Sequence, residues 1–424
     1  MKTTASLSTK LDWQLIIAYI LLMLIGWISI YSAGYNSEGP NIFNVNYTYG
    51  KQFVWIVLSL IIGFFILNVN SKIFSMFANV YYFLTLGLLV LVFFLAKEVN
   101  GAKAWIDLGF FRLQPSEFAK FTTALALASY ISNLDFNIQK KSNFIISVLI
   151  FMVPFFLVLA QHDMGSALVF LSFFLLLNRF GMPSWILYLG FYVIVLSVVS
   201  LLFPIYWIIG FLIVIASVIL YLIRKRKEFV QFMMLAGIVI LVSGIYSFSI
   251  DLVIKKLDKH QQDRIYVMLG KSEDANGKKL NNYQVIQSEI AVGAGQFLGK
   301  GFLKGTQSKG NFLPAKETDT IFCTLAEEWG FLGSLFTLGL LVFIIIRIIY
   351  LAEKQKSKFA KVYGYAVVCI FMIHYIINIG MTLGVLPVIG IPLPALSYGG
   401  SSLISFTILV FVFVKMDSEK WIYA

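Results

Sequence analysis

Asp319 lies where a polar stretch rich in lysine and glycine, GTQSKGNFLPAKETDT, gives way to a strongly apolar run. A carboxylate beside apolar sequence is costly near lipid, so the default explanation for it is a functional one. An ionised carboxylate can act as a general base that takes the proton from an attacking hydroxyl group. We therefore take Asp319 as the candidate catalytic residue.

A second pair of ionisable residues, Glu117 and Lys120, follows the sequence Gln-Pro-Ser, which predicts the first turn of a helix. The two residues are three positions apart, so their side chains share one helix face and can pair. Two explanations stay open. The pair is either a structural bridge, or Lys120 binds a pyrophosphate group while Glu117 fixes the position of the ammonium.

Further carboxylates interrupt the apolar sequence. Asp163, within QHDMGSA, can cap the helix that follows it, ligate a cation or orient Lys120. Glu327 and Glu328 lie inside the apolar run that begins after Asp319. Carboxylates at that depth are compatible with a proton relay and therefore with a transporter.

Lysine is abundant in the segment 250–319, whose basic residues outnumber its acidic ones. Lys300 and Lys304 are set among glycines, and glycines let a backbone approach a phosphate closely. These two lysines are candidates for binding an anionic substrate. The alternative is that they are ordinary solvated side chains of a loop.

A block near the end of the sequence, GVLPVIGIPLPALSYGGSS, also interrupts apolar sequence with three prolines and a pair of glycines. Prolines lack a backbone donor, and non-helical backbone at membrane depth is tolerated where protein buries it or water reaches it. We expect 392–402 to form a tight, non-helical external loop beside Asp319, with exposed amides for a sugar or a pyrophosphate; a plain turn between two spans is the alternative. The candidate binding residues in this block are Ser397, Tyr398, Gly399 and Gly400.

Composition assigns the protein class. Hydrophobic residues make up 59% of the 424 residues and charged residues only 13%, whereas a soluble domain has about 25% charged residues. The chain is therefore predicted to be an all-α, polytopic integral membrane protein, a bundle of about 10–12 transmembrane helices. The apolar runs fall at about 13–32, 53–69, 73–96, 118–134, 144–161, 164–179, 185–203, 205–223, 229–249, 320–350, 362–384 and 401–415.

The basic residues of the short loops predict the orientation of these spans. Most of them fall on one side, which places both termini in the cytoplasm and the segments 97–117, 250–319 and 385–400 outside. The net charge of +12 is then explained by anchoring charge and by anionic lipid headgroups, and nucleic acid is not an expected partner. No linker separates domains, so residues 1–424 are interpreted as one transmembrane domain that includes the long external loop 250–319.

Five blocks in this order resemble the SEDS family of shape, elongation, division and sporulation proteins, the RodA/FtsW peptidoglycan polymerases. They are NGAKAWIDLGFFRLQPSEFAK, QHDMGSA, YQVIQSEIAVGAGQFLGKGFLKGTQS, FLPAKETDTIFCTLAEEWGFLG and LPVIGIPLPALSYGGSS. The sequences GTQS and LPVIGIPLP are more similar to the RodA branch than to the FtsW branch.

The resemblance implies a peptidoglycan glycosyltransferase of the bacterial inner membrane that polymerises lipid II, the undecaprenyl-pyrophosphate disaccharide-pentapeptide, during cell elongation. It further implies that Asp319 is essential and that a class B penicillin-binding protein is the partner. Matching positions make Glu117, Lys120, Asp163, Trp105, Gln114, Thr306 and Gln307 candidate substrate-binding residues. No cofactor is implied. We expect the negative charge on the departing pyrophosphate to be stabilised by Lys120, by loop lysines or by a divalent cation such as Mg²⁺ or Mn²⁺.

The chain departs from the family pattern in three short motifs. Ala104 stands where the family has Arg before Trp105, Glu317 stands where it has His, and His162 stands where it has Pro. The family has ten spans, and we assign the surplus here to 185–249, which we expect at the periphery of the bundle. The rival functional class is a flippase for a lipid-linked precursor, which would have many spans and buried charges without chemistry at Asp319.

Overall fold

The structure is a computed structural model that describes residues 11–35, 42–96, 103–107, 109, 112–224, 229–256, 259–269, 283–310, 312–313 and 315–420. Contacts divide the chain into two compact units, Met1–Met182 with Tyr283–Ala424, and Pro183–Asn282. The interpretation of the whole chain as a single domain stays a prediction.

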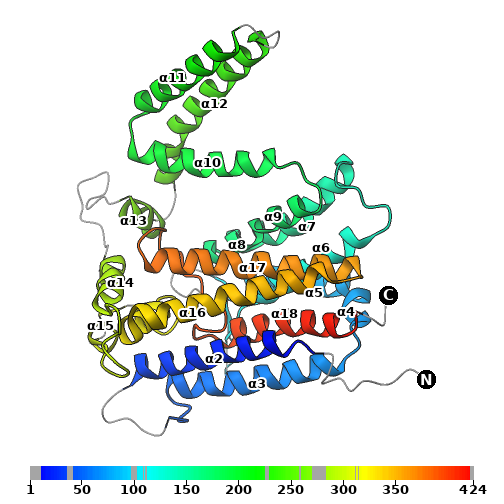
Figure 1. Ribbon diagram of the computed structural model, residues 1–424, viewed down its shortest axis with the longest axis vertical. Coiled ribbons are helices and arrows are strands. Elements are labelled where there is room, and N and C mark those ends of the chain that lie inside the picture. Colours follow the sequence, from blue (N-terminus) through cyan, green and yellow to red (C-terminus); the bar gives the residue numbers. More distant parts are fainter. Residues whose placement is uncertain are drawn as a thin grey trace. The chain divides into compact units, whose positions relative to one another are not determined.

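The larger unit is a bundle of helices, with one two-stranded hairpin in which Ile106 pairs with Leu113. Figure 1 shows the start of α2 and the end of α18 at one end of this bundle, with α14 and α15 at the other. The elements are α2 (Trp13–Gly34), α3 (Thr48–Asn68), α4 (Lys72–Met76), α5 (Ala78–Leu95), β1 (Ile106–Asp107), β2 (Arg112–Leu113), α6 (Pro115–Ser132), α7 (Lys141–Ala160), α8 (Met164–Leu171), α9 (Phe173–Arg179), α14 (Tyr283–Ala294), α15 (Thr306–Lys309), α16 (Ile321–Glu353), α17 (Lys358–Thr382) and α18 (Gly400–Ser418).

Ten helices of the described residues are long and apolar enough to cross a membrane. Two of the twelve apolar runs fall short of that standard. Polar side chains lower the hydropathy of α6, and Ser172 divides 164–179 into α8 and α9. The prediction of a polytopic helical membrane protein with about 10–12 spans is confirmed.

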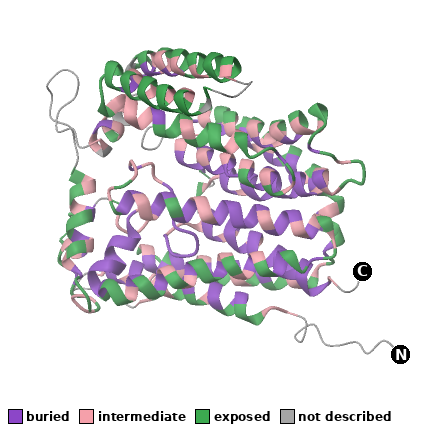
Figure 2. Cartoon of the chain, turned by 45° about the horizontal axis from the view of Figure 1, so that its top comes forward, coloured by how far each residue is buried: buried purple, intermediate pink, exposed green. Residues whose placement is uncertain are grey.

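Helices α17 and α18 are the most buried spans, and Figure 2 shows buried residues along both of them. Helix α18 packs against α3 and α6, while α17 packs against α6 and α16. A small residue allows close packing elsewhere in the bundle: a Cβ added at Gly26 of α2 would lie only 2.6 Å from the Cα of Leu396, in the segment between α17 and α18. Small residues are what allow backbones to approach each other inside membranes.

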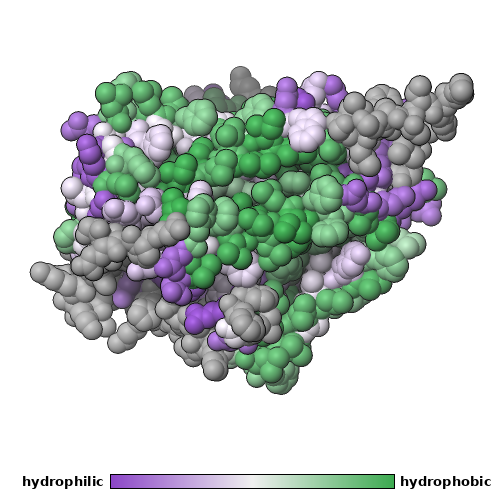
Figure 3. Space-filling model, turned by 90° about the horizontal axis from the view of Figure 1, so that it is seen from below, coloured by the Kyte–Doolittle hydropathy of each residue, from purple (hydrophilic) through white to green (hydrophobic). Residues whose placement is uncertain are grey.

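The outer surface of the bundle matches a lipid environment. On the face shown in Figure 3, hydrophobic side chains form a broad central band, and hydrophilic side chains gather toward its left and right edges. Hydrophobic residues facing outward are expected where lipid, rather than water, surrounds the helices.

Helix α16 is interrupted at Gly330, whose φ of 63° and ψ of −160° are non-helical. The break redirects backbone hydrogen bonds. The amide of Phe331 donates to the carbonyl of Gln296 (2.8 Å), and the freed carbonyl of Glu327 accepts the amide of Lys300 (3.0 Å). The segment before α15 is thereby joined to α16 through backbone groups.

We expect Gly330→Ala to destabilise the larger unit. The combination of a positive φ with a ψ of −160° is one that essentially only glycine adopts, and it costs another residue about 1–3 kcal/mol. The added Cβ would also lie 2.2 Å from the amide nitrogen of Gly299. Gly339→Ala in the same helix is the matched control, because no atom lies within 4 Å of the added Cβ. Thermal unfolding of the purified variants should give a lower Tm for Gly330→Ala only. Equal Tm values would contradict this explanation of the kink.

The smaller unit contains α10 (Trp185–Leu202), α11 (Ile205–Ile223), α12 (Phe229–Lys255) and α13 (Lys259–Met268). Few residues of its spans are buried. Helices α10 and α12 are joined by hydroxyl pairs, which include Tyr192 with Ser243 (2.7 Å) and Ser197 with Tyr246 (2.6 Å). Segment 250–319, predicted as a long loop, contains the end of α12 and three further helices, α13, α14 and α15.

Candidate active site

The Glu117–Lys120 pair is present at the start of α6. Helix α6 begins at Pro115, so the proline stands in the first turn, as the sequence predicts. Glu117 and Lys120 are three positions apart in this helix and therefore share one face. The Lys120 Nζ lies 2.8 Å from Glu117 Oε2, and both side chains are 1% exposed. The other carboxylate oxygen of Glu117 has no hydrogen-bond partner in the described part of the chain.

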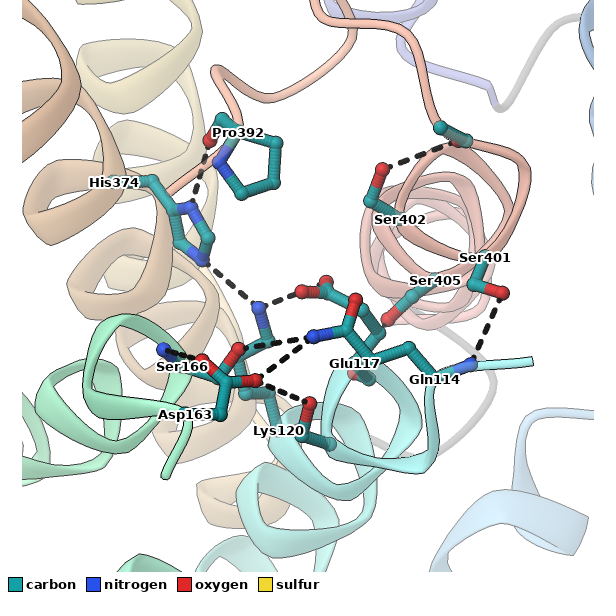
Figure 4. A network of polar contacts seen from close by, with 12 residues as sticks. Gln114, Glu117, Lys120, Asp163, Ser166, His374, Pro392, Ser401, Ser402 and Ser405 are labelled. Carbon is teal, nitrogen blue, oxygen red and sulfur yellow. Dashed lines mark hydrogen bonds and ion pairs between the residues drawn. The ribbon is translucent and has the colours of Figure 1, made fainter. Parts of the chain in front are cut away.

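A histidine joins this pair from a distant part of the sequence. The Nε2 atom of His374 in α17 lies 3.0 Å from Lys120 Nζ, and its Nδ1 atom lies 3.0 Å from the carbonyl oxygen of Pro392 (Figure 4). An ammonium only donates and a carbonyl only accepts. His374 is therefore neutral with its proton on Nδ1, and it accepts from Lys120 while donating to Pro392.

Asp163 forms a second cluster beside the pair. Its Oδ1 accepts the amide of Ser166 (3.0 Å), so the predicted helix cap is confirmed. Its Oδ2 accepts Gln114 Nε2 (2.9 Å) and lies 3.5 Å from the hydroxyl of Ser116 (Figure 4). The structure thus brings the candidate residues Asp163 and Gln114 into direct contact.

Asp319 lies two residues before the start of α16 and is half-buried. Its carbonyl accepts the side-chain amide of Asn378 (3.0 Å), which also donates to the carbonyl of Ile391 (2.6 Å). Its carboxylate lies against Gly390, where an added Cβ would be 3.4 Å from Oδ2. Asn378 therefore attaches the Asp319 backbone to the segment between α17 and α18.

The segment 383–399 is non-helical and lies beside the Asp319 loop, as predicted. Ser397 Oγ donates to the carbonyl of Thr318 (2.6 Å), and the Tyr398 amide donates to the carbonyl of Glu317 (2.8 Å). Helix α18 begins at Gly400, earlier than the expected end of the loop at residue 402. The two loops that the sequence places apart by some sixty residues are adjacent in space.

The prediction that this segment presents exposed backbone amides is wrong. The amide of Ser397 donates to the carbonyl of Leu393 (3.0 Å), and the amide of Gly399 donates to Gln52 Oε1 (3.3 Å). Gly400 is required for packing, because an added Cβ would lie 2.5 Å from the ring of Trp55. These donors hold the loop in place, and the role of 397–400 in substrate binding stays a prediction.

Burial also affects the ionisation of the Tyr398 phenol in this segment. Desolvation raises the pKa of Tyr398, and the nearby Glu317 carboxylate acts in the same direction. The Tyr398 hydroxyl is therefore a neutral hydrogen-bonding group at physiological pH.

Glu327 binds the loop that carries the candidate anion-binding residues. Its fully buried carboxylate accepts Lys300 Nζ (2.8 Å), the amides of Thr306 (2.7 Å), Gln307 (2.9 Å) and Ser308 (3.0 Å), and two hydroxyl groups. A carboxylate that accepts several N–H groups is strongly held in its charged form. The residues expected to bind a substrate phosphate thus bind a carboxylate of the chain itself.

Lys300 and Lys304 therefore differ. Lys300 is paired with Glu327, whereas the Lys304 side chain is exposed. Lys316 is half-buried and donates to the carbonyl of Ser308 (2.8 Å). Desolvation lowers the pKa of the Lys316 ammonium, and the Glu317 carboxylate opposes this effect.

We expect Glu327→Gln to loosen this loop. The amide of glutamine would present a donor to groups that are themselves donors, and hydrogen bonds to charged groups are worth about 1.5–3 kcal/mol each. Trypsin cleavage after the exposed Lys304 should accelerate in the variant. Glu289→Gln on α14, an exposed carboxylate, is the control and should be cleaved like the wild type. Identical cleavage of all three proteins would contradict the anchoring role.

Two of the three departures from the family pattern, Ala104 and His162, lie near Asp163, whereas Glu317 lies in the Asp319 loop. The Lys103 amide donates to the carbonyl of Gln161 (3.0 Å), which places the Ala104-Trp105 segment beside the Asp163 turn. Ala104 is buried, Trp105 is partly exposed and the Lys103 side chain is exposed. His162, which replaces a proline, has a φ of 62°.

Metal binding has little support from side-chain clustering. Among the described residues, no group of three or more His, Cys, Asp or Glu side chains could hold a metal ion.

His374 and Asn378 are not among the residues predicted from sequence. A signal was available, because His374, Asn378 and Thr382 recur every four residues along an otherwise apolar helix and all three are buried. Side chains spaced by four share one face of a helix. A polar stripe of this kind predicts a face that contacts other polar groups inside the bundle.

Known proteins of similar sequence match this chain over nearly its whole length. The family model for cell cycle proteins of the FtsW, RodA and SpoVE group matches residues 12–213 and 209–421. The peptidoglycan glycosyltransferase RodA of Treponema pallidum is 31% identical, covering 96% of this chain and 98% of the relative. The peptidoglycan glycosyltransferase MrdB of Escherichia coli K12 is 32% identical, covering 93% of this chain and 90% of the relative.

Solved structures share the fold. A chain from a peptidoglycan synthase complex that coordinates polymerization and crosslinking matches with a TM-score of 0.69 at 23% identity, over 97% of this chain and 98% of that chain. The rod shape determining protein RodA of Thermus thermophilus matches with a TM-score of 0.62 at 21% identity, over 97% and 98% of the two chains. The chain belongs to the FtsW/RodA/SpoVE family of cell cycle proteins.

Proposed function

We propose that this chain is a peptidoglycan glycosyltransferase that polymerises lipid II into glycan strands during cell elongation. The observation that carries the proposal is the set of hydrogen bonds that joins the Asp319 loop, the 383–399 segment and α17 beside the buried Lys120 ammonium. A carboxylate and a cation on one rigid frame suit a reaction in which a hydroxyl attacks and an anion departs. Relatives that cover nearly the whole chain carry the name peptidoglycan glycosyltransferase.

The proposed reaction transfers a glycosyl group with inversion. The sugar 4-hydroxyl of the acceptor attacks the anomeric carbon of the donor, and the bond from that carbon to the pyrophosphate oxygen breaks. The electron pair leaves with undecaprenyl pyrophosphate, and the hydroxyl proton passes to Asp319. Pyrophosphate leaves readily, so the second carboxylic acid that glycosidases use is not needed.

The negative charge that develops on the departing pyrophosphate must be stabilised by positive charge. Lys120 is a candidate because its ammonium is held in a buried site next to His374. Lys304 is the exposed candidate in the loop. The third candidate is a divalent cation, which Asp319 would help to hold and which would supply the same positive charge. Assays with and without chelator and added Mn²⁺ or Mg²⁺ distinguish the lysines from the metal.

The proposed setting is the bacterial inner membrane, with both termini in the cytoplasm and the Asp319 loop outside. The basic short loops support this orientation. A class B penicillin-binding protein is the proposed partner, since a fold relative comes from a complex that couples polymerization with crosslinking. The exposed apolar faces of α10–α12 offer surface for lipid or for such a partner.

The decisive experiment gives purified protein fluorescent lipid II. Glycan polymer on a gel supports the proposal, whereas translocation of the headgroup without polymer would identify a flippase. A transporter would use Glu327 and Glu328 as a proton relay, whereas both carboxylates are engaged in hydrogen bonds within the chain. Glu327 is bound by Lys300 and by backbone amides, and Glu328 is bonded to the hydroxyl of Ser32.

A further inference from the structure

We propose that His374 and Asn378 are positioning residues that set the location of Lys120 relative to Asp319. His374 links the Lys120 ammonium to the carbonyl of Pro392, and Asn378 links the carbonyls of Ile391 and Asp319. The proposal rests on the proposed glycosyltransferase function and adds two residues to its machinery. Neither residue is a candidate for contact with the substrate.

The first link depends on the chemistry of an imidazole. Lys120 has three donor hydrogens, and its described partners are Glu117 Oε2 (2.8 Å), His374 Nε2 (3.0 Å) and the ring face of Phe406 (5.4 Å). A neutral imidazole accepts at one nitrogen and donates at the other. His374 can therefore fix the ammonium and the Pro392 carbonyl at the same time, and a hydrophobic side chain could do neither.

The second link uses both hydrogens of one amide. Asn378 Nδ2 lies 3.0 Å from the carbonyl oxygen of Asp319 and 2.6 Å from that of Ile391. The side chain is fully buried, so no water competes for these hydrogens. Two carbonyl oxygens that would otherwise repel each other are held together by a shared donor.

The two links act as one frame because His374 and Asn378 are four residues apart on α17. They lie about one helical turn from each other, roughly 6 Å along the axis. Their acceptors, Pro392 and Ile391, are neighbours in the chain. The separation between the lysine site and the Asp319 backbone is thus set by one turn of helix and one peptide unit.

The consequence is catalytic precision more than global stability. A misplacement of about 1 Å in a reacting group can cost about 10²-fold in rate. Loss of either link should therefore lower kcat about 100-fold while KM for lipid II changes little. The bundle around α17 should stay folded, since α17 packs over most of its length through apolar side chains.

The experiment compares isosteric variants in the full-length protein. His374→Leu removes both hydrogen bonds, whereas His374→Gln keeps an acceptor and a donor on one side chain. Asn378→Asp places a carboxylate against two carbonyl oxygens. Thr382→Val is the matched control on the same helix face, because within the described part of the chain the Thr382 hydroxyl bonds only to the carbonyl of Ile379 in its own helix.

We expect His374→Leu and Asn378→Asp to lose about 100-fold in kcat per mole of folded protein. The Tm of His374→Leu should stay near that of the wild type, whereas the buried carboxylate of Asn378→Asp should lower the Tm of that variant as well. His374→Gln and Thr382→Val should keep most of the rate. Hydrogen exchange of the amides in 391–397 is the second readout, and it should accelerate only in the two impaired variants. This readout does not depend on activity. An inactive wild type would therefore defeat the proposed function and leave the positioning test intact.

Two results would overturn the inference. One is hydrogen exchange of 391–397 that is unchanged in both His374→Leu and Asn378→Asp. The other is a His374→Gln variant as slow as His374→Leu, which would show that the paired acceptor and donor are not what the site requires.

Discussion

Asp319→Asn is expected to abolish polymerisation of lipid II while the protein still inserts and folds. The substitution keeps the size of the side chain and removes its basicity. General-base assistance is worth about 10²–10⁴-fold in rate, so the loss should fall in that range or beyond. The Asp319 carbonyl, which anchors the residue to Asn378, is unchanged by the substitution. Polymer formation on a gel, measured per mole of folded protein, checks the prediction.

Glu317→Gln is the control for this experiment. It neutralises a carboxylate two residues earlier in the same loop and leaves intact the backbone carbonyl that accepts the Tyr398 amide. We expect this variant to keep most of the wild-type rate. An Asp319→Asn variant that polymerises at a near wild-type rate would refute the general-base assignment. Equal losses in both variants would show that loop charge, and not the Asp319 carboxylate, is what matters.

Local sequence rules predict the features that depend on neighbouring residues. Hydropathy predicts the spans, and a proline in the first turn predicts the start of α6. The spacing of three between Glu117 and Lys120 predicts their ion pair, and the position of Asp163 predicts its helix cap. These are contacts within a few residues, where helix geometry alone determines the distance.

Apart from the placement of the 383–399 segment beside the Asp319 loop, features that depend on the packing of distant segments were not predicted. His374 meets Lys120 across 254 positions of sequence, and no local spacing rule can identify such a contact. Thr306 and Gln307 were candidate substrate-binding residues, yet their amides donate to Glu327, which reaches them from α16. A loop that suits an anion does not reveal, from sequence, whether that anion belongs to the ligand or to the chain.

The Glu117–Lys120 pair should show strong energetic coupling. Removing one partner of a buried ion pair leaves an uncompensated charge, which costs about 3–5 kcal/mol. Glu117→Gln and Lys120→Met should each lower the free energy of unfolding by that amount. The double variant should recover much of the loss, because replacing both partners of a buried pair by neutral side chains is often nearly neutral. Thermal or chemical unfolding of the four purified proteins measures the coupling.

The double variant also separates stability from function. A charge swap would be a poorer test, because a glutamate at position 120 would face the unprotonated Nε2 of His374. If the pair serves only the fold, the neutral double variant should polymerise lipid II as it regains stability. We expect it to regain stability and remain inactive, since the ammonium next to His374 is then missing. Additive losses in the unfolding free energy would show instead that the two charges are stabilised independently, and a double variant with wild-type activity would remove Lys120 from the catalytic machinery.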